Sequence, residues 1–145
     1  METLKISDIL KPKSRDDILK EISKWDNIEI KIMKAIKERN SPLIDMLLKL
    51  KIINKDIINF KEYGNQTMLH IASYYGFYNL TKFLIKNNAD INLKNIYGND
   101  ALYFAIKAHQ TNIVELLLKN GAKINKKHLT YNKEINKLLK LYNGK

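Results

Sequence analysis

Few residues of this chain could support acid–base or metal chemistry. Its three histidines are His70, His109 and His128, and no two of them have the spacing of a zinc motif such as H-E-x-x-H. Asp16 and Asp17 form an adjacent acid pair at the expected start of a helix, where the helix dipole favours negative charge. The chain has no cysteine, no phosphate loop and no G-x-S-x-G nucleophile motif. We therefore expect no catalytic residue, no metal site and no cofactor.

Two segments carry the same sequence pattern at a distance of 33 residues. The first segment runs from Thr67 to Asn92, and the second runs from Asp100 to Asn125. Identical residues stand one period apart at Leu69 and Leu102, Ala72 and Ala105, Leu84 and Leu117, Ala89 and Ala122, and Asn92 and Asn125. A fixed period of roughly 20–50 residues indicates a protein of stacked repeats. The period therefore moves the search for function from catalysis to recognition by a surface.

The repeated segments resemble ankyrin repeats, whose pattern is a glycine turn, T-P-L-H-x-A, a second helix ending in L-L, and a G-A-D-x-N finger. The matching residues are Thr67, Leu69, His70, Ala72, the turn Tyr97-Gly98, and the finger residues Ala89, Asp90, Asn92, Gly121 and Ala122. The departures are Met68 for proline, Asp100-Ala101 for Thr-Pro, Tyr103 for histidine, Asn88 for glycine, and Gly64 one residue early.

The resemblance implies an all-α, helix-turn-helix solenoid of about three repeats that binds another protein and has no catalytic activity. It also implies that His70 is a structural histidine whose ring bonds between loops.

A third, degenerate copy precedes these two. Residues 35–37 and 43–49 align with residues 105–107 and 113–119 at a constant offset of 70. Because 70 is two periods plus four, the additional residues fall within Leu50–Ile58, and we expect a longer loop there. Ser41-Pro42 has the character of an N-cap followed by the first helical residue. The repeat region is thereby divided into a degenerate repeat at 27–61 and ankyrin repeats at 62–94 and 95–127.

A capping helix is expected at each end, because the terminal repeats of a solenoid need a polar cover. In the N-terminal extension, residues 1–26, Pro12 ends any short helix, and Ser14 with Asp17 begins a helix over Arg15–Trp25. Its apolar residues Ile18, Leu19, Ile22 and Trp25 either cover the first repeat or bind a partner directly. Residues 128–145 contain a C-terminal capping helix with apolar residues Ile135, Leu138, Leu139 and Tyr142, ended by Asn143-Gly144.

Several small residues have expected backbone roles. Gly121 and Asn88 follow a second helix, at the position that takes a left-handed backbone. His109 stands at the usual glycine turn between the two helices of a repeat. Asn92 and Asn125 lie in fingers, where an asparagine amide can bond to backbone groups of the loop.

The formal net charge is +11, and 24 of the 26 basic residues are lysine. Arginine's planar fork suits phosphates and base edges better than lysine does, and only Arg15 and Arg39 are present. This scarcity disfavours nucleic acid as the partner. The charge is also spread along the chain. Two interpretations remain: an A/T-rich genome that favours lysine, asparagine and isoleucine, or a weak preference for acidic partners.

The positions that match the partner-binding surfaces of ankyrin proteins, the finger tips and the exposed side of the first helices, are rich in tyrosine. In one repeat they are Tyr63, Gln66, Tyr74, Tyr75, Asn87 and Lys94. In the next repeat they are Ile96, Tyr97, Asn99, Lys107, Ala108, Asn120 and Lys127. Tyrosine is enriched at binding hot spots because it is large, fairly rigid and amphipathic. The alternative is that some rings, above all Tyr74 and Tyr97, pack on neighbouring repeats.

The sequence thus favours a non-catalytic, monomeric interaction module that binds an unknown protein partner through its concave face. No apolar run approaches the roughly 20 residues of a membrane span, and the N-terminus lacks a signal-peptide pattern. We expect a cytoplasmic protein without membrane association, in its own cell or in a host cell. A second hypothesis is a basic surface for nucleic acid or an acidic protein segment, made of Lys107, Lys123, Lys126, Lys127 and the C-terminal lysines. A third is an enzyme subunit whose activity depends on a partner.

Overall fold

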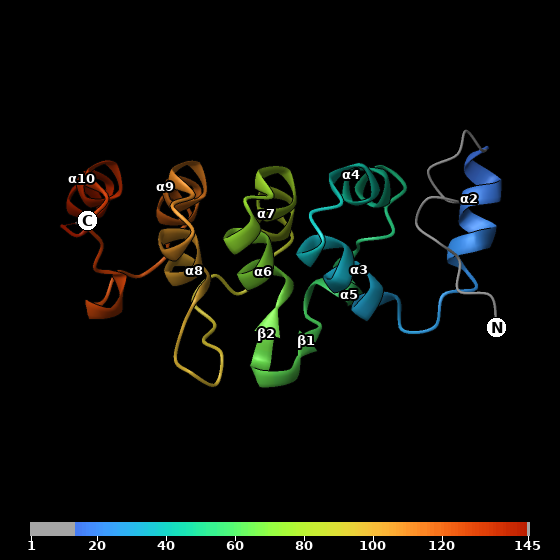
Figure 1. The fold of residues 1–145 in the computed structure, drawn as a ribbon, viewed down its shortest axis with the longest axis horizontal. Coiled ribbons are helices and arrows are strands. Elements are labelled where there is room, and N and C mark those ends of the chain that lie inside the picture. Colours follow the sequence, from blue (N-terminus) through green and yellow to red (C-terminus); the bar gives the residue numbers. More distant parts are fainter. Residues whose placement is uncertain (1–13, 145) are drawn as a thin grey trace. The chain divides into compact units, whose positions relative to one another are not determined.

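The computed structural model describes residues 14–144 (Figure 1). The expectations for residues 1–13, including the role of Pro12, lie outside the described residues. Contacts within the chain define two compact units, Met1–Asn54 and Lys55–Lys145. In both units the described elements are mainly α-helices, in agreement with the predicted all-α class.

The described helices of the first unit are α2 (Arg15–Ile22), α3 (Ile28–Lys37) and α4 (Ser41–Lys49). The helices α3 and α4 pack against each other as a hairpin. Their buried faces carry Ile32, Ile36, Leu43 and Leu47. This hairpin corresponds to the degenerate copy found in the sequence.

The predicted start of α2 is confirmed, because the Ser14 Oγ accepts a hydrogen bond from the N–H three residues on, at 3.2 Å. The predicted end at Trp25 is wrong, since the helix ends at Ile22. The Ser23 hydroxyl donates to the Lys20 carbonyl at 2.7 Å. Such serine bonds compete with the helical ladder and favour a helix end.

The N-cap of α4 is Asn40, whereas the sequence predicted Ser41. The Asn40 Oδ1 accepts a hydrogen bond from the Leu43 N–H at 3.1 Å. Arg39 has a left-handed backbone with a φ of 56°, so the chain leaves α3 one residue before Asn40. This turn places the side-chain amide of Asn40, and not the hydroxyl of Ser41, beside the unpaired N–H groups at the N-terminus of α4.

The described part of the second unit consists of short elements around two helix pairs. In chain order these are α5 (Lys55–Ile58), β1 (Lys61–Glu62), the 3₁₀ turn η1 (Tyr63–Asn65), β2 (Gln66–Thr67), α6 (Met68–Tyr75), α7 (Tyr78–Lys86), α8 (Ala101–Lys107), α9 (Thr111–Lys119), the 3₁₀ turn η2 (Lys126–His128) and α10 (Lys133–Tyr142). The predicted loop within Leu50–Ile58 therefore contains the helix α5. The strands β1 and β2 are antiparallel, with Lys61 opposite Thr67.

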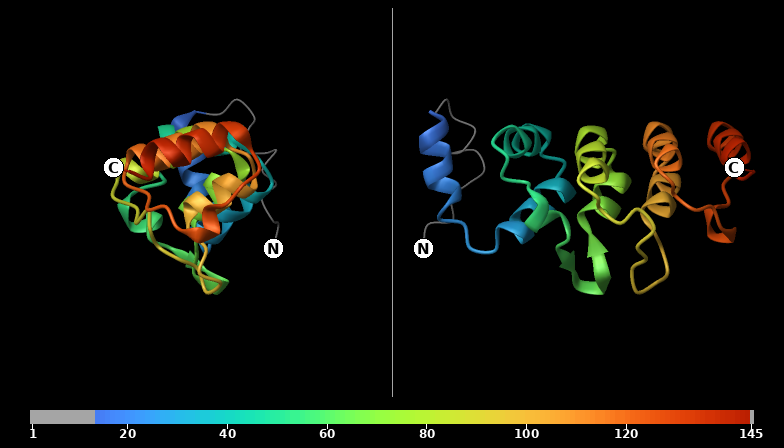
Figure 2. Two further views of the ribbon diagram at one scale, coloured as in Figure 1. Left: turned by 90° about the vertical axis from the view of Figure 1, so that its left-hand side faces the viewer. Right: turned by 180° about the vertical axis from the view of Figure 1, so that it is seen from behind.

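Two rows of helices stack side by side in the second unit (Figure 1 and Figure 2). The inner row is α6 and α8, which pack against each other, and the outer row is α7, α9 and α10. In the sequence α10 follows α8 by one period, but it packs against α9, and the short η2 contacts α8 instead. Ile135 and Leu139 of α10 are buried, while Lys133 and Lys137 are exposed. The amphipathic C-terminal helix is therefore present as predicted.

The turns between the helices have the predicted left-handed backbones. The φ angle is 96° at Gly121 and 65° at Asn88, the two positions that follow an outer helix. It is 56° at His109 and 82° at Gly76, the two positions between an inner and an outer helix. Each pair is separated by 33 residues, so the backbone repeats even where the residue type does not.

Candidate functional site

Two loops precede the helices of the inner row. We name them the first finger, residues 61–67, and the second finger, residues 95–100. Asn95 organises the second finger, because its buried Oδ1 accepts hydrogen bonds from the N–H groups of Tyr97 and Asn99, each at 3.0 Å. Gly98 completes the turn with a φ of 73°. The finger is thus a closed turn that holds its tip outward.

The tips of the two fingers touch. The Ile96 N–H donates to the Gly64 carbonyl at 3.0 Å. Three large side chains stand exposed at this junction: Tyr63 is 93% exposed, Tyr97 is 70% exposed and Ile96 is 56% exposed. We name Tyr63, Ile96 and Tyr97 the finger-tip cluster.

Lys127 fixes the second finger from the far side. Its Nζ donates to the Tyr97 carbonyl at 2.7 Å and to the Asn99 Oδ1 at 3.3 Å. The sequence placed Lys127 among the residues that contact a partner or an acidic ligand. In the structure its ammonium group is already used within the chain, so its first effect is to position Tyr97.

The inner helices present a second group of rings. The Tyr74 ring packs edge-on against the rings of Tyr75, at 5.0 Å between centroids, and Phe104 of the next repeat, at 6.3 Å. The prediction that Tyr74 packs on a neighbouring repeat is confirmed, although the ring stays partly exposed. The same alternative is wrong for Tyr97. On α8, the Lys107 Nζ lies 5.5 Å from the centre of the Tyr103 ring, a residue that the sequence did not select.

The remaining predicted residues differ in their surroundings. Lys94, Lys107 and Asn120 are exposed, and Asn87 and Asn120 bond to carbonyls of their own outer helix, at 2.8 Å each. Gln66 and Ala108 are half-buried, and the Gln66 Oε1 has no hydrogen-bond partner within residues 14–144. Asn87 and Asn120 therefore stand apart from the finger-tip cluster.

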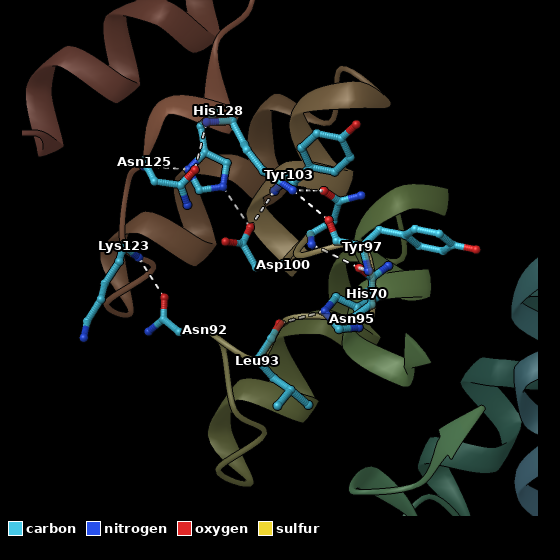
Figure 3. Close-up of polar contacts among 12 residues, drawn as sticks. His70, Asn92, Leu93, Asn95, Tyr97, Asp100, Tyr103, Lys123, Asn125 and His128 are labelled. Carbon is cyan, nitrogen blue, oxygen red and sulfur yellow. Dashed lines mark hydrogen bonds and ion pairs between the residues drawn. The ribbon is translucent and has the colours of Figure 1, made fainter. Parts of the chain in front are cut away.

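His70 has the structural role implied by the resemblance (Figure 3). Its Nδ1 accepts from the Thr67 N–H at 3.0 Å, and its Nε2 donates to the Leu93 carbonyl at 2.9 Å. Burial lowers the pKa of His70 below its ordinary value, and the Leu93 bond and nearby carboxylates offset this only in part. A neutral ring with both nitrogens engaged fits a bridge between loops.

His128 has a corresponding role that the sequence analysis did not assign to it. The ring is 1% exposed; Nδ1 accepts from the Asn125 N–H at 3.0 Å, and Nε2 donates to the Asp100 Oδ1 at 2.8 Å (Figure 3). The same Asp100 oxygen accepts from the Tyr103 N–H at 2.9 Å and caps α8. A signal was available, because His128 follows Asn125 by three residues as His70 follows Thr67.

These bonds act on the pKa of Asp100. Burial by itself raises the pKa of this carboxyl. The hydrogen bonds from His128 and Tyr103 and the charges of His128 and Lys94 outweigh burial, so the pKa lies below its ordinary value. Asp100 is thus held as a carboxylate that joins η2 to the start of α8.

Asn92 bonds to loop backbone, as predicted, and the loop belongs to the next repeat. Its Nδ2 donates to the Gly121 carbonyl at 3.1 Å, and its Oδ1 accepts from the Lys123 N–H at 2.9 Å (Figure 3). Asn125 instead accepts from the Lys127 N–H at 2.9 Å within η2. The amide of Asn92 therefore closes the space between two consecutive finger bases.

The part of the chain that the structure describes contains no cluster of side chains of the kind that binds a metal ion. Within residues 14–144 no three histidine or acidic side chains gather as metal ligands. The same residues include no helix long and apolar enough to cross a membrane. Besides the finger-tip cluster, large apolar groups are exposed at Leu129 and Tyr131, between η2 and α10, which the sequence reasoning did not select.

The comparisons with known proteins agree with the repeat geometry. A family model described as ankyrin repeats, in three copies, matches residues 32–128. A search of curated proteins found no match to this chain. Ankyrin repeats are generally protein–protein interaction modules, and the family is generally non-catalytic. With its paired helices, left-handed turns, bridging histidine and matched family model, the chain belongs to the ankyrin repeat family.

Proposed function

We propose that this chain is a non-catalytic binding module that engages a partner protein through the finger-tip cluster and the adjoining exposed side of α6 and α8. The observation that supports this most directly is the exposure of Tyr63, Ile96 and Tyr97 on two fingers that touch. Large apolar side chains in water cost free energy that burial against a partner recovers, at about 25 cal/mol per Å². Tyrosine also brings a hydroxyl that can bond across an interface.

The rigidity of the second finger supports the same proposal. Tyr97 is held by the Asn95 amide on one side and by the Lys127 ammonium on the other. These bonds hold the backbone of Tyr97, and a loop whose backbone is already held in place loses little conformational entropy on binding. Rigid, exposed aromatic groups are the usual anchors of protein interfaces.

Tyr74, Tyr103 and Lys107 extend the proposed surface along the inner helices. Tyr74 remains partly exposed, and the Lys107 ammonium lies over the Tyr103 ring. Gln66, Tyr75, Lys94 and Asn99 border this surface. Asn87 is left at its edge, since its amide bonds to its own helix.

A basic surface for nucleic acid gains no support from particular contacts. Lys119 forms an ion pair with Glu115 at 2.7 Å on the outer helix α9, and Lys127 is bonded to the second finger. Lys133 and Lys137 are exposed on α10, away from the inner row. The ammonium groups of Lys119 and Lys127 are thus already paired or bonded within the chain, which lowers their value for following a phosphate backbone.

The test uses two tyrosine variants as bait for protein partners from native cytosol. The double variant Tyr63→Ala/Tyr97→Ala removes the two exposed rings, and Tyr131→Ala removes a fully exposed ring outside the cluster. For a partner captured by the unchanged chain, the double variant should lose about 2 kcal/mol or more of binding free energy, the size of a hot spot. The control should lose under about 0.5 kcal/mol, and neither variant should change the urea midpoint.

Other results would reject the proposal. Equal binding by the double variant and the unchanged chain would exclude the finger tips. Binding that survives the tyrosine changes but is abolished by Lys126→Gln/Lys133→Gln/Lys137→Gln and falls steeply with salt would identify the basic surface.

We propose that the chain acts as a monomer. Sedimentation equilibrium at the concentrations of the binding assay measures its oligomeric state directly.

A further inference from the structure

The period of 33 residues extends one copy further back than the repeats compared above. The pattern I-N-x-K occurs at Ile58–Lys61, Ile91–Lys94 and Ile124–Lys127. The asparagine of the middle copy, Asn92, joins its finger base to the next one through the Gly121 carbonyl and the Lys123 N–H. By the same spacing, Asn59 would be expected to bond to the Asn88 carbonyl and the Asp90 N–H.

Asn59 does not make this bridge. Its side chain is exposed, and no hydrogen bond of the Asn59 side chain occurs within the residues that the structure describes. The four additional residues before it fold into the turn and helix α5, which ends at Ile58. The insertion thus changes how the chain enters the first finger, at the point where the asparagine bridge would otherwise close the repeat junction.

A cavity of about 310 Å³ lies where the bridge is missing. Its floor is apolar and includes Ile58, Leu69 and Ala89, all nearly fully buried. Its rim includes the amide of Asn59, the ammonium of Lys61 and the carboxylate of Asp90. Small-molecule and side-chain pockets in proteins begin at about this volume, and they combine an apolar lining with a few polar groups.

We propose that this cavity takes one aliphatic side chain, of leucine, isoleucine or methionine size, from an extended segment of a partner protein. The Asn59 amide bonds to the main chain of that segment. This rests on the proposed function, because the segment belongs to the same partner that covers the finger-tip cluster. Lys61 at the rim stands two residues before Tyr63, a distance of roughly 7 Å along an extended chain.

The chemistry of Asn92 identifies the occupant as a polypeptide. In this structure an asparagine at that repeat position holds a carbonyl and the N–H two residues further along the chain. Every extended protein segment offers this pair. An adenine edge also offers a donor and an acceptor to an asparagine amide, but the aliphatic floor of the cavity suits an aliphatic side chain and not a planar base. The rim carries one positive and one negative side chain, and the Asp90 Oδ1 also accepts from the Asn92 N–H at 3.0 Å. Because these two charges balance, the rim favours the neutral main chain of a peptide over a charged ligand group.

The experiment selects peptides from a random 12-residue display library on the full chain and measures their affinity by fluorescence anisotropy. Ala89→Leu fills the cavity from its floor. Ala122→Leu makes the same change one period later, where Ala122 lines a separate cavity of about 340 Å³ beside Gly121 and Tyr142. The expected result is at least a tenfold loss of affinity for Ala89→Leu and less than a twofold loss for Ala122→Leu. Replacing one aliphatic residue of the peptide by alanine should cost the same tenfold, with no further loss in combination with Ala89→Leu.

Two further measurements keep the result independent of folding. Asn59→Ala removes an exposed side chain without a bond, and it should weaken the peptide three- to tenfold at an unchanged urea midpoint. Methyl resonances of Ile58 should shift on titration with the peptide, whereas those of Ile124 should not.

The proposal is overturned if no selected peptide requires an aliphatic residue, if no peptide is selected, or if Ala122→Leu is as harmful as Ala89→Leu. Loss of binding in Tyr63→Ala/Tyr97→Ala together with full binding by Ala89→Leu would reject the cavity and leave the finger-tip surface in place. Full binding by all of these variants would reject both.

Discussion

At the scale of single residues, the repeats conserve backbone conformation more strictly than residue type. Gly76 and His109 share a left-handed turn one period apart, and so do Asn88 and Gly121. Glycine adopts this conformation without strain, and asparagine tolerates it better than most other residues. The turn geometry is therefore a property of the repeat, which different residues satisfy at different cost.

The two turns after the outer helices should respond differently to substitution. A Cβ at Gly121 would meet no atom within 4 Å, so Gly121→Val tests backbone strain alone. We expect a loss of about 1–3 kcal/mol in the free energy of unfolding, because a β-branched residue is strained at a φ of 96°. Asn88→Gly should be neutral or slightly stabilising. Urea unfolding measures both, and equal losses would show that the two turns do not share one conformation.

His70 should make stability depend on pH. Its folded-state pKa is lowered, above all by burial, from the ordinary value of about 6.5. Below that pH the unfolded chain binds more protons at this site than the folded chain. The contribution of His70 is therefore complete above about pH 6.5 and is lost as the pH falls through the folded pKa.

A nuclear magnetic resonance titration of the His70 ring measures this pKa directly, and a value above 6.5 would contradict the prediction. Urea unfolding at pH 7.5 and pH 5.5 gives the linked change in stability. His70→Gln, although less stable at both pH values, should show a smaller difference in unfolding free energy between them.

Asp100 affects stability in a different pH range. Because its folded-state pKa is lowered, its contribution to the free energy of unfolding is lost only at pH values below about 3.9.

At the scale of elements, η2 does more than connect α9 to α10. His128 joins it to Asp100 at the start of α8, and Lys127 joins it to the tip of the second finger. The sequence analysis places this lysine on a charge-binding surface, but its bonds at 2.7 Å and 3.3 Å show that it holds a loop. The C-terminal turn therefore supports the surface that we propose for the partner.

Lys127→Met should loosen the second finger, since methionine keeps the apolar stem but removes the donor. We expect a loss of about 0.5–1.5 kcal/mol in stability, the usual contribution of one hydrogen bond. Amide hydrogen exchange at Tyr97 and Asn99 should become faster. Lys126→Met, one residue earlier and exposed, is the matched control. Identical exchange in the two variants would mean that the ammonium group does not hold the finger.

At the scale of the whole molecule, the first unit depends on apolar groups that α2 contributes. Ile22 at the end of this helix is 4% exposed, whereas Trp25 is half-buried with the Lys31 ammonium 5.2 Å from the centre of its ring. Terminal repeats of a solenoid need such a cover because each repeat leaves one apolar side open.

Ile22→Ala should therefore cost about 2–5 kcal/mol in the free energy of unfolding, the usual range for a buried isoleucine. Ile30→Ala removes the same atoms from a half-exposed position on α3 and should cost much less. Deletion of residues 1–25 should lower stability or solubility in the same direction. A deleted chain that unfolds at the same urea concentration and stays monomeric would show that this segment is not a cover.

The sequence alone determined the repeat, the paired helices and the left-handed turns, and the family resemblance implied the bridge made by His70. Each of these is encoded locally, in helical periodicity, in the sterics of a turn or in a motif of a few residues. Only the tertiary structure decided that Tyr97 is exposed while Tyr74 packs, that α10 joins the outer row, and that His128 is paired with Asp100. It also decided that the Asn92 amide bonds across a repeat junction, whereas Asn59, one period earlier, lines a cavity. These features depend on distances between neighbouring repeats, which loop length and stacking set jointly and which no single repeat contains.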